Sequence, residues 1–196
     1  MFIQTESTPN PATLKFLPGR AVMGDVPPQD FPSAASAAHT PLAQALFAVA
    51  GVASVFFGKD FIAVSKSDGD MEWDDIKPQI LGVMTDFFAS GAEVFSPAAA
   101  RAAASDKTDD ADEPDAVRQI KQVLETHVRP AVAQDGGDIV FESFEKGVVW
   151  LSLRGACAGC PASLVTLKQG VEHVLQHYVP AVREVRARDA ASGDAL

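Results

Sequence analysis

Two cysteines, Cys157 and Cys160, are the residues of this chain whose chemistry and spacing most clearly indicate a site. Thiols two residues apart can bind one metal ion, because a tight turn brings both sulfurs within the roughly 2.3 Å reach of a tetrahedral ion. Gly155 and Gly159 supply the backbone freedom for such a turn. Pro161 then starts a helix, and the N-terminal end of a helix favours thiolate over thiol at Cys160. We therefore expect an exposed loop, between a strand and a helix, that holds a cation or an anionic cluster.

Taken alone, the cysteine pair leaves three interpretations open: ligation of a metal or cluster, thiol–disulfide chemistry, and an inert pair. The number of ligands favours a shared site, because zinc sites and iron–sulfur clusters usually take four protein ligands and this chain has two thiols. Two copies meeting about a twofold axis would supply four thiolates, the number that a [4Fe–4S] cluster takes. Against thiol–disulfide chemistry, the pair follows a predicted hairpin rather than the strand of a thioredoxin-like βαβ unit.

The spacing Cys157-x2-Cys160-x12-His173-x3-His177 also matches a two-Cys, two-His zinc finger. A helix that begins directly after Cys160 would place His173 nearly 20 Å away, at about 1.5 Å for each residue. One zinc ion does not span that distance, and helical angles place both histidines on the solvent side. We expect two exposed histidines, unless Gly170 breaks the helix and restores the finger.

The composition is that of a globular protein and argues against nucleic-acid and membrane partners. Hydrophobic residues make up 47% of the 196 residues, and the formal net charge of −10 would repel a phosphate backbone. Apolar runs fall far short of the roughly 18 residues of a membrane-spanning helix, and the N-terminus lacks the pattern of a secretory signal. These features predict a protein that is made and kept in the cytoplasm.

Charge and composition divide the chain into two domains. The first 97 residues carry a formal charge of −6, the next 19 carry −4 and the remainder is neutral. Residues 98–113 are rich in alanine and acidic residues, without a large apolar side chain that could offset the entropy of being ordered. We predict domains at 1–97 and 114–189, joined by a flexible linker at 98–113 and followed by a tail at 190–196. A short exposed helix in the linker is the alternative, and it would keep the two domains.

Each domain is predicted to be a small sheet packed with helices, which is the α+β class. In the first domain, breakers between short apolar segments indicate two hairpins, and Pro78 is expected to kink the second of two helices. The strands are expected at 2–5, 13–17, 52–57 and 61–65, and the helices at 41–50 and about 72–90.

The second domain is predicted in the order helix, strand, strand, helix, strand. Three strands covered by two helices would bury a core in roughly 75 residues. The segment Asp135–Asp138 is expected to be a turn that caps a helix and starts a strand, in preference to a carboxylate pair for a metal. The helices are expected at 114–130, where Pro130 ends or bends the first, and at 161–178, with strands around 139–141, 149–153 and 182–187.

Three blocks of the chain resemble the Nfu family of iron–sulfur cluster scaffold and carrier proteins, and they occur in the family's order. They are Phe2–Pro11 with Leu14–Phe16, then Gln134–Asp138, and finally Gly155–Pro161. The first block looks like the N-terminal domain of that family, and the other two look like its NifU-type C-terminal domain. A serine common in the family after the cysteine–proline step is Ala162 here, which leaves both thiols unaffected.

The resemblance implies a carrier rather than an enzyme. It implies that Cys157 and Cys160 are the ligands of a [4Fe–4S] cluster shared by two protomers, which form a homodimer when the cluster is bound. The cluster would come from upstream assembly proteins and be handed to apo iron–sulfur client proteins. A thiol–disulfide oxidoreductase that uses the same cysteines and a zinc-bridged structural dimer are the alternatives. The N-terminal domain has no cysteine, so client docking or tuning of the dimer is expected of it. Because the match starts at the first residues, the chain looks similar to a bacterial form, which again predicts the cytoplasm.

Overall fold

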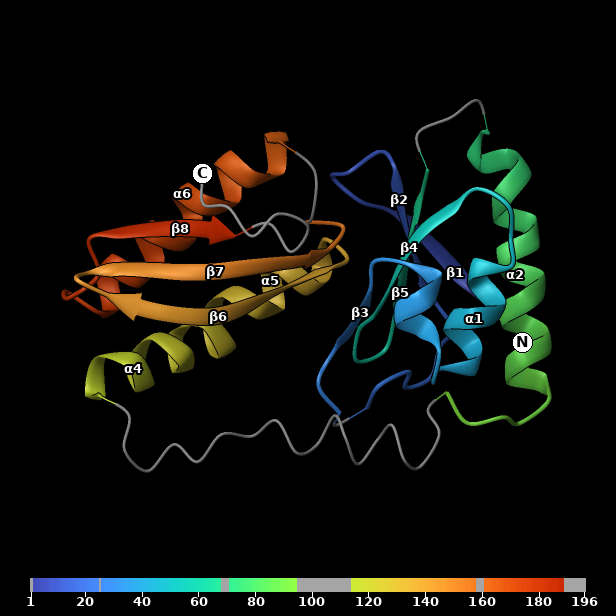
Figure 1. Ribbon diagram of the computed structural model, residues 1–196, viewed down its shortest axis with the longest axis horizontal. Coiled ribbons are helices and arrows are strands. Elements are labelled where there is room, and N and C mark those ends of the chain that lie inside the picture. Colours follow the sequence, from blue (N-terminus) through green and yellow to red (C-terminus); the bar gives the residue numbers. More distant parts are fainter. Residues whose placement is uncertain (1, 25, 68–70, 95–113, 158–160, 189–196) are drawn as a thin grey trace. The chain divides into compact units, whose positions relative to one another are not determined.

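Two units, each with its own sheet and its own hydrophobic core, make up the chain. The computed structural model describes residues 2–24, 26–67, 71–94, 114–157 and 161–188, with the backbone alone at 161–167. The units are residues 1–107 and 108–196 (Figure 1). Each combines helices with a sheet, which confirms the predicted α+β class. The predicted linker at 98–113 and tail at 190–196 lie outside the described residues and stay predictions.

The N-terminal unit is built on a five-stranded sheet with the order β1-β2-β5-β4-β3, in which every neighbouring pair is antiparallel. Phe16, Leu46 and Ile80 are fully buried between the sheet and its helices. Both predicted hairpins and both predicted helices are present. The strands are β1 (Gln4–Ser7), β2 (Thr13–Leu17), β3 (Gln29–Phe31), β4 (Val52–Phe57) and β5 (Ile62–Lys66), and the helices are α1 (Pro41–Phe47) and α2 (Trp73–Ala89), with a 3₁₀ turn η1 (Ala34–Ala37).

The edge strand β3 is an element that the sequence pattern did not predict. It is three residues long and lies between Pro28 and Pro32, which interrupt any alternating pattern. Its place in the sheet comes from pairing with β4, where Phe31 lies opposite Val55. The ring of Phe31 meets Phe57 edge to face at 5.2 Å. Tertiary packing therefore creates this strand.

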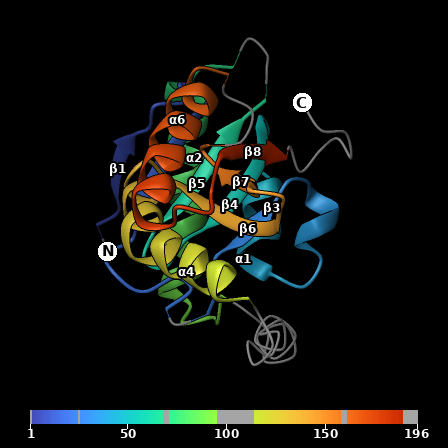
Figure 2. The same ribbon diagram turned by 90° about the vertical axis from the view of Figure 1, so that its left-hand side faces the viewer.

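The C-terminal unit has the predicted order of helix, strand, strand, helix and strand. Its sheet runs β6-β7-β8, with β6 antiparallel and β8 parallel to the central strand. Figure 2 shows α4 and α6 side by side, and both bury apolar residues against the sheet. The elements are α4 (Asp115–Val123), the π-helical segment η3 (Leu124–Val128), α5 (Arg129–Gln134), β6 (Gly137–Glu145), β7 (Val148–Gly155), α6 (Pro161–Tyr178) and β8 (Glu184–Arg188).

A change of helix type marks the position where Pro130 was expected to end or bend the first helix. The amide of Arg129 donates to the carbonyl of Leu124, five residues back, instead of to the usual partner four residues back. Pro130 has no N–H and sits in the first turn of α5, where none is needed. The chain thereby continues in helical form as far as Gln134.

The hairpin of β6 and β7 determines which residues meet at the far end of the two strands. Its turn consists of Lys146 and Gly147, both with positive φ (52° and 86°), as a two-residue hairpin turn requires. An irregularity between Phe141 and Ser143 shifts the register by one residue. As a consequence Gly137 lies opposite Gly155, where the cysteine segment begins.

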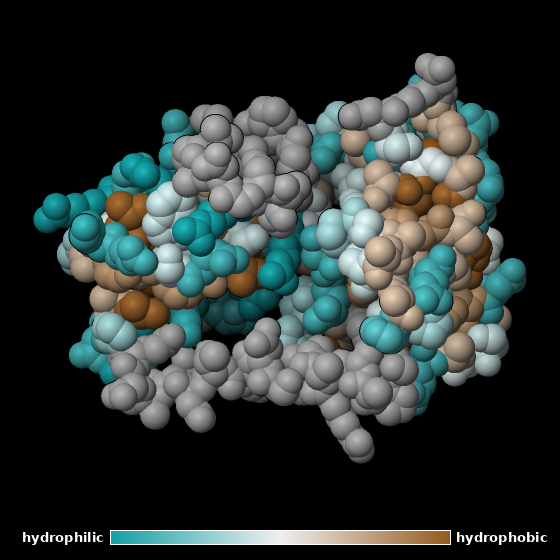
Figure 3. All heavy atoms as spheres, viewed as in Figure 1, coloured by the Kyte–Doolittle hydropathy of each residue, from teal (hydrophilic) through white to brown (hydrophobic). Residues whose placement is uncertain are grey.

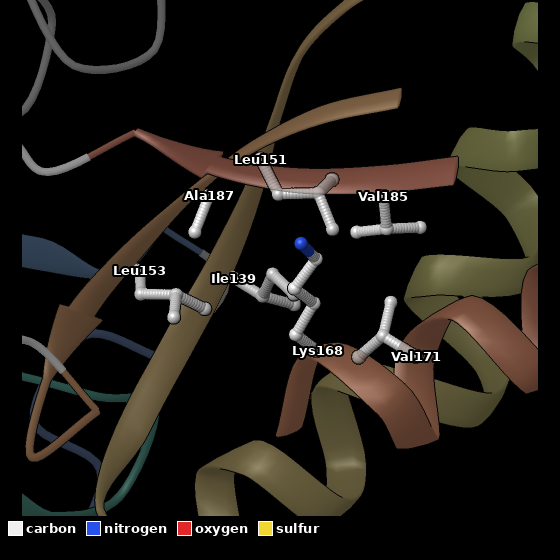
Figure 4. A pocket seen from close by; sticks show the side chains of 7 residues that line it. All are labelled: Ile139, Leu151, Leu153, Lys168, Val171, Val185 and Ala187. Atoms are coloured by element: carbon white, nitrogen blue, oxygen red, sulfur yellow. The ribbon is translucent and has the colours of Figure 1, made fainter. Parts of the chain in front are cut away.

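The helix α6 packs against the apolar face of the sheet, and a small pocket lies between them among the described residues. A pocket of about 10 Å³ lies between Ile139, Leu151, Val185 and the side chain of Lys168 (Figure 4). A volume of this size holds one water molecule at most, so this pocket is packing rather than a ligand site. The aliphatic part of Lys168 lies over the apolar residues, as long charged side chains often do.

The described helices were compared with the length and apolarity that a bilayer requires. None of the helices in the described part of the chain is long and apolar enough to cross a bilayer. The face drawn in Figure 3 mixes hydrophilic and hydrophobic residues. Tyr178, the last residue of α6, is 49% exposed. Its ring lies 4.7 Å from that of His127.

Candidate functional site

Cys157 lies in the hydrophobic core of the C-terminal unit, two residues after the end of β7. It is 4% exposed, and the preceding Ala156 is 2% exposed. The expectation of an exposed cysteine loop is therefore wrong at this position. Gly155 adopts a left-handed conformation with φ of 64°, and the chain turns after it, so that the sulfur packs against Gly137 on the neighbouring strand.

Gly137 makes room for the sulfur because it has no side chain. A Cβ built on Gly137 would lie 2.6 Å from the Cys157 sulfur and 3.2 Å from the Cys157 Cβ. It would also lie 2.8 Å from the carbonyl oxygen of Arg154. Carbon atoms do not approach other heavy atoms this closely without displacement. We call this position of the sulfur, directly against Gly137, the thiol seat.

A backbone hydrogen bond joins the cysteine segment to the turn before β6. The amide of Ala156 donates to the carbonyl of Gly136 at 3.2 Å. The turn itself is shorter than predicted, because Asp135 and Gly136 form it while Gly137 and Asp138 already belong to β6. Gly136 has φ of 79°, a conformation that favours glycine. The blocks Gln134–Asp138 and Gly155–Pro161, which are separate in the sequence, are thus in direct contact.

A partly buried ion pair anchors the start of β6 to the preceding helix. The Nε and Nη2 atoms of Arg129 each lie 2.8 Å from a carboxylate oxygen of Asp138, which is 4% exposed. Nη1 of Arg129 also donates to Glu125. The hydrogen bonds that Arg129 donates to Asp138 raise the pKa of Arg129, and burial opposes this effect. Asp138 therefore has the structural role expected for this segment.

The second predicted ligand, Cys160, lies outside the described residues. The helix α6 begins at Pro161, as predicted, and is continuous through Gly170 to Tyr178. His173 and His177 are exposed on it, so the condition for the zinc-finger alternative is not met. Within the described part of the chain, no group of three His, Cys, Asp or Glu side chains is placed to hold a metal ion.

The site residue that sequence analysis missed is Gly137. It was assigned to a turn together with its neighbours, and no local pattern distinguishes it from Gly136. The available signal was its position at the start of a strand, where a glycine often marks a close approach of another segment. Identifying that segment requires the register of β6 and β7, which depends on the irregularity near Phe141.

Two protein families match the chain. The family described as "Scaffold protein Nfu/NifU N terminal" matches residues 3–91, and the family described as "NifU-like domain" matches residues 120–186. Proteins named "NFU1 iron-sulfur cluster scaffold homolog, mitochondrial" from Drosophila willistoni and Drosophila persimilis are each 51% identical over 185 residues, or 94% of this chain. The chain spans 63% and 64% of the length of these two relatives.

A solved structure of a NifU-like protein from Saccharomyces cerevisiae is 30% identical over 50% of this chain and 86% of its own. The TM-score between the two structures is 0.44. The predicted cytoplasmic location is wrong by the comparison with the Drosophila relatives, whose names place them in mitochondria. The charge and packing of folded domains do not encode a compartment, because targeting signals are recognised by receptors.

The order of the family matches is the order of the two structural units, and the relatives match nearly the whole chain. The N-terminal match covers the five-stranded sheet, and the C-terminal match includes β6, β7, α6 and the cysteine pair. The chain therefore belongs to the Nfu family, with an Nfu-type N-terminal domain followed by a NifU-like domain.

Proposed function

We propose that this protein is a non-enzymatic carrier in which Cys157 and Cys160 of two chains together hold one [4Fe–4S] cluster. The observation that carries the proposal is the position of the pair in the NifU-like domain, directly before α6, in a chain that has no other cysteine. A [4Fe–4S] cluster takes four thiolates, so one chain supplies half of them and a second chain supplies the rest.

Delivery proceeds by exchange of ligands. A thiolate of the apo-protein forms a bond to a cluster iron, the bond from that iron to Cys157 or Cys160 breaks, and the released thiolate takes up a proton. Four such exchanges move the cluster, and no atom changes its oxidation state. The exchange requires cysteine sulfurs at the surface, where the client's thiolates can reach the iron atoms.

The experiment is anaerobic reconstitution followed by iron and sulfide analysis, an absorption spectrum and a measurement of mass in solution. We expect about four iron and four sulfide per dimer. Cys157→Ser and Cys160→Ser should each abolish the cluster. His173→Ala with His177→Ala is the matched control, and it should leave the iron content unchanged because both histidines are exposed on α6.

Each alternative gives a different result in the same experiment. Zinc without sulfide or a visible chromophore would indicate the zinc-bridged dimer. Catalytic reduction of insulin disulfides by a chain without iron would indicate the thiol–disulfide oxidoreductase. A full cluster in either serine variant, or a monomeric chain that holds the cluster, would contradict the proposal.

A further inference from the structure

The burial of Cys157 conflicts with its use as a ligand of a shared cluster. The residue is 4% exposed and belongs to the core of the C-terminal unit. A cluster held between two chains is larger than a single ion and has to contact sulfurs that reach the surface of both chains. The sulfur seen here therefore has to leave the thiol seat before it binds an iron atom.

We infer that Gly137 is a positioning residue for Cys157: its missing side chain creates the thiol seat, in which the sulfur rests in the apo protein and from which it moves to bind a cluster. The inference rests on the proposed function for the identity of the ligand. It deepens that function, because it assigns the site a second, buried position of the same thiol.

The backbone of Gly137 shows that space, and not backbone conformation, is the reason for glycine at this position. Gly136 and Gly155 have positive φ values of 79° and 64°, which any side chain would strain. Gly137 is not among the residues with positive φ, so an alanine could adopt its conformation. What an alanine could not do is coexist with the Cys157 sulfur 2.6 Å from its Cβ.

The strand that carries Gly137 is held in place on both sides of the seat. On the β6 side, the Arg129–Asp138 ion pair and the pairing of Gly137 with Gly155 fix the strand. Cys157 itself lies beyond the last residue of β7. The sulfur can thus turn out of the seat without breaking the ladder between the strands.

The test measures how fast iodoacetamide alkylates Cys157 in the apo chain. Cys160→Ser in every variant leaves Cys157 as the single thiol in the sequence. In Gly137→Ala the new methyl group displaces the sulfur from the seat, and we expect alkylation about tenfold faster, because thiol reactivity follows exposure. Gly170→Ala is the matched control, since a Cβ there meets no atom within 4 Å. Equal rates in Gly137→Ala and Gly170→Ala would overturn the inference.

A second measurement separates displacement of the sulfur from loss of the fold. Gly137→Ala is made in the Cys157 chain and in a chain that carries Cys157→Ala, and the two losses of melting temperature are compared. We expect a clearly smaller loss when the sulfur is absent. An equal loss, or failure to fold in both chains, would show that the Arg154 carbonyl is what Gly137 accommodates, and would overturn the inference. Denaturant titration gives the fraction of Gly137→Ala that is unfolded in the absence of denaturant. If this fraction exceeds about 1%, alkylation of unfolded chains would dominate the rate, and the comparison of melting temperatures alone tests the inference.

Both measurements are made on protein without a cluster. A failure of the inference can therefore be distinguished from a failure of the proposed function. If Cys157 reacts faster in Gly137→Ala but the protein never assembles a cluster, the inference about Gly137 holds and the proposed carrier function is refuted. A cluster that assembles normally on a chain whose Cys157 reacts equally fast in Gly137→Ala and in the control would support the carrier and refute the seat.

Discussion

The two units of this chain differ in what they bury. The N-terminal unit fills its core with large apolar side chains, and its buried Lys15 pairs with the exposed Glu6 at the surface. The C-terminal unit has a smaller sheet, yet it buries a thiol at Cys157 and a paired carboxylate at Asp138. Burial of a carboxylate is costly unless it is paired, whereas a neutral thiol packs as a small apolar group. Both units bury polar residues, and in the second unit Cys157 and Asp138 are buried at or beside its candidate site.

The largest effects should come from matched cavities in the two cores. Leu46 and Leu175 are both fully buried, one in each unit. We expect Leu46→Ala and Leu175→Ala each to cost about 3 kcal/mol of unfolding free energy in their own unit. Only Leu175→Ala should lower the cluster content, because the cysteine pair belongs to the second unit.

The two tryptophans make the measurement specific to each unit. Trp73 lies in α2 and Trp150 in β7. A Trp150→Phe chain keeps Trp73 and reports on the N-terminal unit, and a Trp73→Phe chain keeps Trp150 and reports on the C-terminal unit. Denaturant unfolding followed by fluorescence then gives each free energy separately. An equal loss of cluster in Leu46→Ala would show that the units depend on each other, and it would break the comparison.

Most elements of both units were predictable from sequence, with the edge strand β3 as an exception, and the geometry of the site was not. Apolar spacing, Pro161 and the Lys146–Gly147 turn are local signals, and they placed α6 and the β6–β7 hairpin correctly. The burial of Cys157 is not local. Counting residues from the turn without the irregularity near Phe141 would pair Gly137 with Ala156, and the actual partner is Gly155. One inserted residue therefore decides which position faces the thiol.

A smaller effect should distinguish the ion pairs of the two units. Asp138→Asn removes one carboxylate partner of Arg129. The arginine is 28% exposed and keeps its contact with Glu125, so we expect a loss of about 2 kcal/mol of unfolding free energy, less than for a fully buried pair. Glu6→Gln is the control, and its exposed pair with Lys15 should be worth about 0.5 kcal/mol. Urea unfolding, which adds no salt, measures both.

The pH dependence of this loss follows from Arg129. The ion pair raises the pKa of this guanidinium, so its stabilising effect is complete below the ordinary pKa of arginine and is lost only when the pH rises beyond it. We therefore expect the difference between Asp138→Asn and the parent chain to be the same at pH 7 and pH 9. A difference that shrinks over this interval would mean that another titrating group supports the start of β6.

The smallest effects concern helix glycines and should be the same in both units. Gly82 in α2 and Gly170 in α6 are exposed, and a Cβ on either would meet no atom within 4 Å. Alanine at each position should raise the unfolding free energy by roughly 0.5–1 kcal/mol, because glycine loses more backbone entropy in a helix. The same substitution at Gly137 should have the opposite sign, since the Cys157 sulfur occupies the space for the methyl group. If Gly170→Ala were destabilising while Gly82→Ala was not, α6 would have a neighbour in solution that approaches this face, and the second copy required by a shared cluster would be the first candidate.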